Sequence, residues 1–443
     1  MTTVQHMIPC RLSIIAGVCA TVFALQSTPV AAAPLLLTDE ALLGTRQDGS
    51  PLQIKINEGL AALDRRDLGG AEAAFRAAAE LDAKQAGPYI GLAEVAAQRK
   101  ELAVADKWMA RALSVSPNDV SALRAWGGML LQRGKFAEAE AAFKKAVAAA
   151  PQSAGAHMQL GETYLIGLKQ PKAAEASYQA ALAARPGSLD AQLGLAASMA
   201  AQGRVEDTVA AFEQAAKLAP QDPRPLHSLA RFYASQLKFD QALATLDRTL
   251  AIAPAHGAAL LDRGDLLLAS NQPEKAIVAF EAAAKATRQP APARFRQGVT
   301  LEMLQRWDDA DRAYSDAIKG EPRMFAAYNN LAFMNASRKV KLDEALAYSK
   351  KAIELAPNDP RLQDTLGWVH LARGELDPAA KAIVKAVTAY PEVANFQYHL
   401  GIVYDAQGRS KEAAAALRKA LELDKNLRGA ADARERLKKL ASK

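Results

Sequence analysis

Residues 160–186 read LGETYLIGLKQPKAAEASYQAALAARP. The segment joins Leu160 to Gly161, places a large Tyr178 among alanines and ends at Pro186. Small and apolar residues recur in it at intervals of three to four, which is the spacing of one face of an α-helix. Proline breaks the interior of a helix but is tolerated in its first turn or between helices. The stretch therefore predicts two helices joined by a short turn, with Pro186 between this pair and the next.

The same pattern recurs along the chain every 34 or 35 residues. Prolines mark the period, with one interval of two periods, at Pro117, Pro151, Pro186, Pro220, Pro254, Pro322, Pro357 and Pro391. Arg288 stands at the missing mark, and one further period at each end reaches Ala83 and Lys425, which makes eleven marks. About twenty-four residues before each mark stands Gly or Ala, and eight residues before it stands a large residue, with Ser349 as the exception. The small residues are Gly59, Ala93, Gly127, Gly161, Ala196, Ala230, Gly264, Gly298, Ala332, Gly367 and Gly401. Self-similarity at this period predicts a stack of helix pairs.

Within each repeat, the small residues let the helix axes approach and the large residue fills the space beside them. Four glycines fall midway between marks, where glycine ends a helix in a left-handed conformation: Gly134, Gly203, Gly374 and Gly408. Extra residues near 165–169 and 339–341 are expected to lengthen only the turn between the two helices.

The repeat resembles the tetratricopeptide repeat family in the order of its residues over 34 positions. The order is a large residue, Leu-Gly, Tyr, Ala, an aromatic residue, Ala and Pro. The resemblance covers residues 52–427 and implies an all-α fold, a right-handed α-solenoid of about eleven helix-turn-helix repeats. Residues 428–443 form an amphipathic pattern, which predicts a C-terminal capping helix that covers the last repeat.

The N-terminus has the three parts of a secretory signal peptide: Arg11, an apolar run over residues 12–25, and small residues up to Ala33. Pro34 would follow a cut after Ala33 and fits signal peptidase poorly, so cleavage is expected after Ala32. Residues 1–32 are therefore predicted to be the signal peptide and residues 33–51 a linker. The exported chain would be periplasmic or secreted, although retention of the segment as an anchor stays open.

A lipoprotein anchored through Cys19 is disfavoured, because Ala16 and Val18 occupy the places of the leucine and the small residue that such a site needs. Cys10 and Cys19 are the two cysteines of the chain and both precede the expected cut. A chain without cysteine cannot mispair in an oxidising compartment, which suits export.

Composition and missing motifs exclude several classes of function. The net charge of +7 comes from 55 basic and 48 acidic residues, and each basic pair has acidic neighbours, so no nucleic-acid partner is expected. The sequence contains no Gly-rich phosphate loop, no Gly-x-Ser-x-Gly and no His-Glu-x-x-His. We therefore expect a protein that is not an enzyme, with no catalytic residue, cofactor or metal, and without a membrane span once the signal peptide is removed.

The resemblance implies a concave groove lined by the first helix of each repeat, through its second, fifth, sixth and ninth residues. In this sequence the register selects Arg231, Phe295, Arg296, Asn329, Asn330, Phe333, Arg361, Asp364, Trp368 and Tyr398. Aromatic side chains beside Arg and Asn suit a peptide, because rings supply area and amides bond its backbone. A five-residue carboxylate clamp known in the family is matched only by Asn330 and Arg361, so a groove for internal peptide segments is the expectation.

The function expected from these observations is a periplasmic scaffold that binds other proteins or peptide segments in an envelope assembly. Residues 329–368 resemble repeats of bacterial proteins that serve exopolysaccharide production and export. In the alternative, a carbohydrate- or polymer-binding module, Phe295, Phe333, Trp368 and Tyr398 would stack on sugar rings. The sequence leaves the oligomeric state open.

Overall fold

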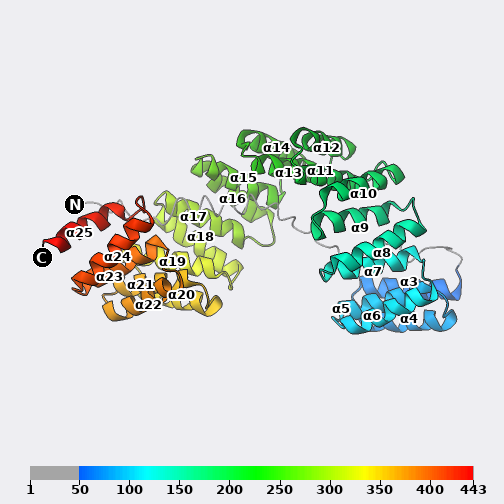
Figure 1. The fold of residues 1–443 in the computed structure, drawn as a ribbon, viewed down its shortest axis with the longest axis horizontal. Helices are drawn as coiled ribbons and strands as arrows, with labels where there is room; N and C mark the ends of the chain where they lie inside the picture. Colours follow the sequence, from blue (N-terminus) through cyan, green and yellow to red (C-terminus); the bar gives the residue numbers. More distant parts are fainter. Residues whose placement is uncertain (1–48, 443) are drawn as a thin grey trace. The chain divides into compact units, whose positions relative to one another are not determined.

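The structure is a computed structural model that describes residues 49–442. Within this range it contains 23 α-helices, one π-helical turn and no strand (Figure 1). The all-α prediction is confirmed. The predicted signal peptide and most of the predicted linker lie outside the described residues.

The chain divides into two compact units, and the division falls between Phe232 and Tyr233. The helices of the first unit are α3 Pro51–Asp64, α4 Leu68–Leu81, α5 Ala86–Gln98, α6 Leu102–Val115, α7 Val120–Gln132, α8 Phe136–Ala149, α9 Ala154–Glu162, the π-turn η1 Thr163–Gly167, α10 Pro171–Ala184, α11 Leu189–Ala201 and α12 Val205–Leu218. Helix α13 Arg224–Ser235 contains the division.

The second unit continues with α14 Phe239–Ile252, α15 Gly257–Ala269, α16 Pro273–Ala286, α17 Ala291–Met303, α18 Trp307–Gly320, α19 Phe325–Arg338, α20 Leu342–Leu355, α21 Pro360–Ala372, α22 Leu376–Ala389, α23 Ala394–Ala406, α24 Ser410–Leu423 and α25 Ala430–Ala441. Consecutive helices pack as pairs from α3 with α4 to α11 with α12 in the first unit and from α15 with α16 to α23 with α24 in the second (Figure 1). With α13 and α14, which follow each other in the chain, the order of the helices agrees with the eleven repeats that the sequence predicts.

Each repeat is closed by a large side chain of the second helix, which lies against the small residue of the first. A Cβ atom on Gly59 would lie 2.6 Å from Cε1 of Phe75, so no side chain fits at that position. The ring of Phe75 also lies against Gly91 of the following repeat, where a Cβ would again be 2.6 Å away. Phe75 has no exposed surface, and burying such a ring stabilises the fold by about 1.5–3 kcal/mol. One aromatic ring therefore closes its own repeat and joins it to the next.

The turn inside each repeat contains a residue in the left-handed region. The four predicted glycines are confirmed there, with φ of 72° at Gly134, 74° at Gly203, 79° at Gly374 and 75° at Gly408. In the other seven repeats this place is taken by Arg66, Lys100, Lys169, Leu237, Asn271, Gln305 and Lys339, with φ between 54° and 64°. The turn geometry is therefore kept even where the residue type disfavours it.

The two extra residues are accommodated differently. Near residue 165 the helix itself absorbs the insertion as the π-turn η1, so the expectation that only the turn lengthens was wrong there. Near residue 340, helix α19 has 14 residues where α21 has 13, and the connection over residues 339–341 is no longer than that over residues 373–375, so the expectation was wrong there too. Both Lys339 and Lys341 adopt positive φ.

The first helix of several repeats begins two or three residues after the marking proline because a polar side chain caps it. Asp119 accepts a hydrogen bond from the backbone N–H of Ala122 at 2.7 Å, and Ser153 accepts one from Ala156 at 3.3 Å. Such caps satisfy backbone donors that have no partner inside the helix.

The chain ends in α25, which packs on α24. Ala430 and Ala433 are buried, and Arg436 forms an ion pair of 2.7 Å with Asp405 of α23. Among the described residues, no helix combines the length and the continuous apolar character needed to cross a membrane.

Candidate functional site

Nine of the ten predicted groove residues lie in the second unit, on the first helices of four consecutive repeats, α17, α19, α21 and α23. The tenth, Arg231, is half-buried on α13 and belongs to the first unit. The structure brings several of the nine into direct contact.

Three rings from successive repeats, those of Phe333, Trp368 and His399, contact one another and form what we call the aromatic cluster. The centroids of Phe333 and His399 are 6.2 Å apart. The rings of Phe333 and Trp368 are 6.1 Å apart and inclined by 19°, and those of Trp368 and His399 are 4.5 Å apart. Trp368 is only 9% exposed, and its indole N–H donates a hydrogen bond of 3.0 Å to Ser337 Oγ. The indole is therefore contacted by two rings and held at its polar edge by a hydroxyl.

His399 is fixed by a carboxylate of the preceding repeat. Its Nδ1 lies 2.8 Å from Oδ2 of Asp364, whose residue is 6% exposed. The pair sets the orientation of the imidazole ring against Trp368. Tyr398 lies next to it, with ring centroids 5.7 Å apart, and its hydroxyl donates to Asp432 of α25 at 2.9 Å. The hydroxyl group of Tyr398, which a ligand in the groove would otherwise contact, is therefore engaged by the last helix, α25.

Arg361 is the most accessible of the predicted groove cations, with 71% of its side chain exposed. Its Nε donates to Asp359 at 2.9 Å, and this hydrogen-bonded pair raises the pKa of Arg361 and lowers that of Asp359. Asp359 also accepts from the backbone N–H of Arg361, at the start of α21. The guanidinium is thus held at the start of α21 with most of its surface in solvent.

A buried polar cluster lies beneath the asparagines of α19. Tyr314 donates a hydrogen bond of 2.7 Å to Glu302, and the amide of Asn330 donates to the Tyr314 hydroxyl at 3.3 Å. Burial raises the pKa of Glu302 to about 7, against the smaller opposing effect of the Tyr314 hydrogen bond. Burial and the neighbouring Glu302 raise the pKa of Tyr314 as well. Asn330 therefore belongs to a structural network as well as to the predicted groove.

Asn329 differs from its neighbour. Its side-chain N–H₂ lies 3.5 Å from Asn330 Oδ1, whereas its own Oδ1 is buried and accepts no hydrogen bond from any described residue. A buried acceptor without a partner costs about 1–3 kcal/mol. Asn329 Oδ1 is therefore an unsatisfied acceptor that is closed to solvent in this side-chain rotamer.

Arg296 and Phe295 of α17 are also largely engaged within the protein. Nη1 of Arg296 lies 3.1 Å from Oδ2 of Asp265, an ion pair without hydrogen-bond geometry. Asp265 is 2% exposed, and burial raises its pKa to about 7 in spite of the nearby Arg296. Phe295 packs on Tyr314, with ring centroids 5.9 Å apart.

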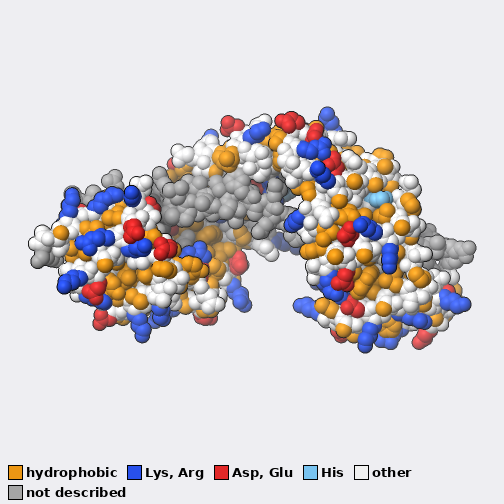
Figure 2. Space-filling model, in the orientation of Figure 1, with side chains coloured by type: hydrophobic (Ala, Val, Ile, Leu, Met, Phe, Trp, Pro, Cys, Tyr) orange, Lys and Arg blue, Asp and Glu red, His pale blue; other side chains and the backbone are white. Residues whose placement is uncertain are grey.

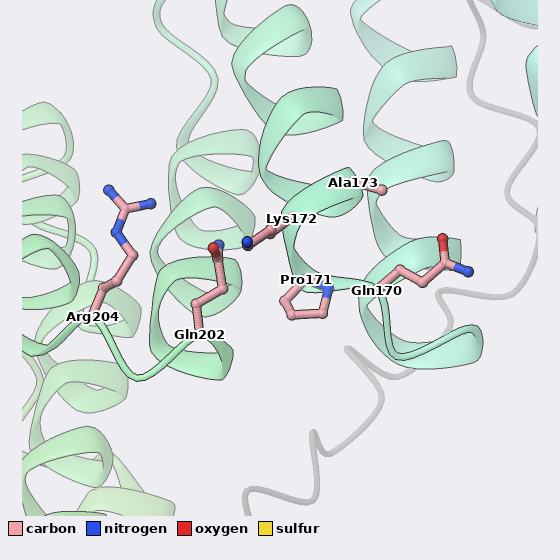
Figure 3. A pocket seen from close by; sticks show the side chains of 6 residues that line it. All are labelled: Gln170, Pro171, Lys172, Ala173, Gln202 and Arg204. Atoms are coloured by element: carbon pink, nitrogen blue, oxygen red, sulfur yellow. The ribbon is translucent and has the colours of Figure 1, made fainter.

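A separate hollow of ≈ 690 Å³ opens in the first unit at the start of α10, lined by Gln170, Pro171, Lys172, Ala173, Gln202 and Arg204 (Figure 3). Its Arg204 is bonded to Glu175 at 2.8 Å and to Asp207 at 2.7 Å. The guanidinium is therefore already neutralised by protein carboxylates. Over residues 49–442, no three His, Cys, Asp or Glu side chains gather as a metal site would require.

Sequence reasoning placed the predicted groove residues on first helices but missed the links between these helices. The pairs Asp265 with Arg296 and Asp364 with His399 each join residues about one repeat apart. Opposite charges at that spacing on two first helices are the signal that would have revealed them. Glu302 and Tyr314 gave no such signal, because their contact depends on how two helices of one repeat pack.

Three sequence profiles described as tetratricopeptide repeat match this chain. One matches residues 120–163, the second residues 165–232, 199–261 and 233–298, and the third residues 295–360 and 365–430. Together the matches cover more than half of the chain.

A relative from Pseudomonas aeruginosa, the TPR repeat-containing protein PA4667, is 26% identical over 145 residues, which are 32% of this chain. The match spans 25% of that relative's length.

Solved structures with similar helical repeats include the Cut9-Hcn1 hetero-tetramer of APC/C (TM-score 0.44, 13% identity, 93% of this chain and 99% of that chain). PilF of Pseudomonas aeruginosa has a TM-score of 0.40 with 21% identity, over 46% of this chain and 92% of that chain. Likenesses of this size carry no inference about what the chain binds. The period, the eleven helix pairs and the profile matches agree, and the chain belongs to the tetratricopeptide repeat family.

Proposed function

We propose that the protein is a periplasmic scaffold that binds segments of partner proteins along the first helices of the second unit. The fold is one suited to protein–protein interaction, and such repeats are typically non-catalytic. The proposal includes two further points. The chain catalyses no reaction, and it serves an envelope assembly in polysaccharide production or export.

The unsatisfied acceptor of Asn329 is the observation that carries the peptide site. Asn329 and Phe333 are four residues apart on α19 and therefore share one helix face. Rotation of the half-buried Asn329 side chain would bring its unsatisfied Oδ1 to the surface, where the backbone N–H of an extended peptide would donate to it. The side chain of that peptide would pack on the half-buried ring of Phe333. The exposed guanidinium of Arg361, on the next first helix, adds a donor for a peptide carbonyl or carboxylate.

The state of the other aromatic side chains favours a peptide over a sugar. Stacking on a sugar needs an open ring face, but Trp368 contacts both Phe333 and His399 and is 9% exposed. Phe295 is packed on Tyr314, and Tyr398 is bonded to Asp432. The rings that the carbohydrate alternative requires are therefore mostly used within the protein.

The groove is tested by comparing two double variants in affinity capture from envelope extracts. Asn329→Ala with Arg361→Ala is expected to lose the captured proteins, while its urea unfolding stays near that of the wild type. The control, Arg312→Ala with Lys351→Ala, removes two cations of second helices and should capture normally. Retention of polysaccharide with no protein in the wild-type sample would overturn the scaffold and support the alternative.

Export is tested separately by N-terminal sequencing of the protein released by osmotic shock. The expected first residue is Ala33. Recovery of the full-length chain from the cytoplasmic fraction alone would contradict the periplasmic location without affecting the groove.

A further inference from the structure

A second candidate surface lies in the first unit, far along the sequence from the predicted groove. Helices α4, α5 and α6 enclose a hollow of ≈ 660 Å³ that we call the cationic hollow. Its lining combines Tyr89, Trp108 and Val104 with four cations and two carboxylates. The cations are Arg76, Arg99, Lys107 and Arg111, and the carboxylates are Glu72 and Glu101. Figure 2 shows hydrophobic side chains interspersed with Lys and Arg over this end of the first unit.

The two rings and two of the cations form one layered structure. Tyr89 and Trp108 are stacked, with centroids 6.1 Å apart and planes inclined by 15°. The guanidinium of Arg76 lies 5.7 Å from the Trp108 ring, and that of Arg111 lies 5.5 Å from the Tyr89 ring. Cation–π contacts of this kind hold the charges against an apolar surface instead of leaving them in bulk water.

The position of Trp108 is unusual for this chain. Nine residues before the mark, nine of the eleven repeats have Ala, Ser or Thr, and only Trp108 and Tyr348 are large. The fold therefore does not need a ring at this position, since most repeats close without one. The large indole adds an apolar surface that the helix packing alone does not explain.

The cations of the hollow are only partly neutralised. Arg76 and Arg99 share Glu72, at 2.7 Å and 2.6 Å. Lys107 and Arg111 form no ion pair with any residue from 49 to 442 and are exposed on α6. Val104, 40% exposed, lies on the same face of α6 one turn earlier. The surface therefore fits a ligand that combines apolar side chains with two negative charges.

The chain contains one such segment close to this unit. Residues 35–43 read LLLTDEALL, with five leucines and the adjacent Asp39 and Glu40. They are followed by residues 44–48, which connect to Gly49 just before α3. Residues 44–49, fully extended, span about 20 Å. This span is roughly the length of the 14-residue helix α3, which packs beside α4. The outer face of α3 exposes Ile54 beside Asn57 and Glu58. It suits an acidic apolar segment less, because Glu58 would repel the carboxylates and Lys55 is already paired with Glu58 at 2.7 Å.

We propose that the cationic hollow is the docking surface for residues 35–43 of the same chain, with leucines on Trp108 and Val104 and with Asp39 and Glu40 facing Lys107 and Arg111. The segment follows the expected cleavage point, so it is retained after export. Apolar burial and two charge pairs act together, and the attraction between the charges weakens as salt increases.

Disulfide trapping tests the docking in the full chain. Cys10 and Cys19 are replaced by Ser, and Val104→Cys is combined with either Leu36→Cys or Leu42→Cys. A disulfide forms only when the two Cβ atoms approach to about 4 Å, so docking predicts an intramolecular bond in at least one of the two variants under mild oxidation. Peptide mapping by mass spectrometry identifies the bond. The control partner is Leu218→Cys, which is 42% exposed in the same unit and lies outside the hollow.

A charge swap makes the test specific for the two cations. Lys107→Glu with Arg111→Glu should lower the disulfide yield about fivefold or more, and adding Asp39→Lys with Glu40→Lys should restore it. Lys145→Glu, at the position of Arg111 in the following repeat, should leave the yield unchanged.

Intramolecular trapping with the charge-swap response supports the proposal. A bond that forms equally with Leu218→Cys, a bond found only between two molecules, or no bond in either variant would overturn it. None of these outcomes bears on the groove of the second unit, whose test uses other residues.

Discussion

A Cβ atom on Gly127 would lie 2.5 Å from Cε1 of Phe143, closer than any side-chain atom can approach a ring. Gly127→Ala is therefore expected to displace the fully buried Phe143 and to lower the free energy of unfolding by about 2–4 kcal/mol. Urea unfolding followed by circular dichroism measures the loss. Gly187→Ala is the matched control, because a Cβ there meets nothing within 4 Å. Equal stability of the two variants would contradict the packing described here.

Leu237 has a φ of 59° and is 64% exposed, so the backbone strain of a left-handed leucine is not offset by burial. Leu237→Gly should raise the free energy of unfolding by about 0.5–1 kcal/mol. The reciprocal change, Gly203→Leu, should lower it by at least a similar amount, because Gly203 has the same place in its repeat with a φ of 74°. Thermal melts of both variants beside the wild type decide the sign.

Glu302 makes the stability of the second unit dependent on pH. Its pKa is about 7 in the folded chain and near the ordinary 4.5 when unfolded, so the folded form holds the proton through that window. The free energy of unfolding should therefore fall as pH rises from about 4.5 to 7. Asp265, with a pKa of about 7, acts in the same direction.

Glu302→Gln removes one titrating group and keeps an acceptor for the Tyr314 hydroxyl. From pH 4.5 to pH 8, the free energy of unfolding of the variant should rise by about 1–3 kcal/mol relative to that of the wild type. Urea unfolding at both pH values measures the difference. Glu422→Gln, with 72% of the glutamate side chain exposed, should show no such change. Parallel curves for the wild type and Glu302→Gln would refute this assignment.

Trp368 is expected to act through packing. Trp368→Ala removes one of the three rings of the aromatic cluster and should lower the free energy of unfolding by about 3–5 kcal/mol. Trp368→Phe keeps a ring there and loses the hydrogen bond to Ser337, so about 1 kcal/mol is expected, with partner capture retained. Loss of polysaccharide retention in Trp368→Phe, at unchanged stability, would instead favour the carbohydrate alternative.

Tyr398 holds the last helix through its hydroxyl. Tyr398→Phe removes the hydrogen bond to Asp432 and should loosen α25 by about 1 kcal/mol. Hydrogen exchange should become faster over residues 430–441 and stay unchanged in α19. Tyr390→Phe, 56% exposed, is the control and should alter neither segment.

The sequence was sufficient for the repeat and insufficient for the contacts between repeats. The period, the small and large residues, and the glycine turns follow from local rules, and they predicted eleven helix pairs. Leu237 and Gln305 could not be assigned to left-handed turns, because their residue types disfavour that conformation and only the packing of the pair enforces it.

The predicted groove shows the same limit. The register placed Trp368 on the right helix, but its burial depends on Phe333 and His399 from the repeats on either side. Whether an aromatic side chain lines a groove or packs in a cluster is decided by residues about 35 positions away. The residue pattern within one repeat therefore does not show which side chains the neighbouring repeats place against it.

The double contact of Phe75 has a consequence for how this chain has been able to change length. Its ring touches Gly59 of its own repeat and Gly91 of the next. The place of Gly59 holds Gly or Ala in all eleven repeats, whereas the place of Gly91 holds side chains as large as Arg296 and His399 elsewhere. Removing or duplicating one whole period therefore keeps the contact inside each repeat but sets a different residue against the ring at the new junction. Tandem duplication in the gene preserves the core of every unit and leaves only the junction between units to be refitted.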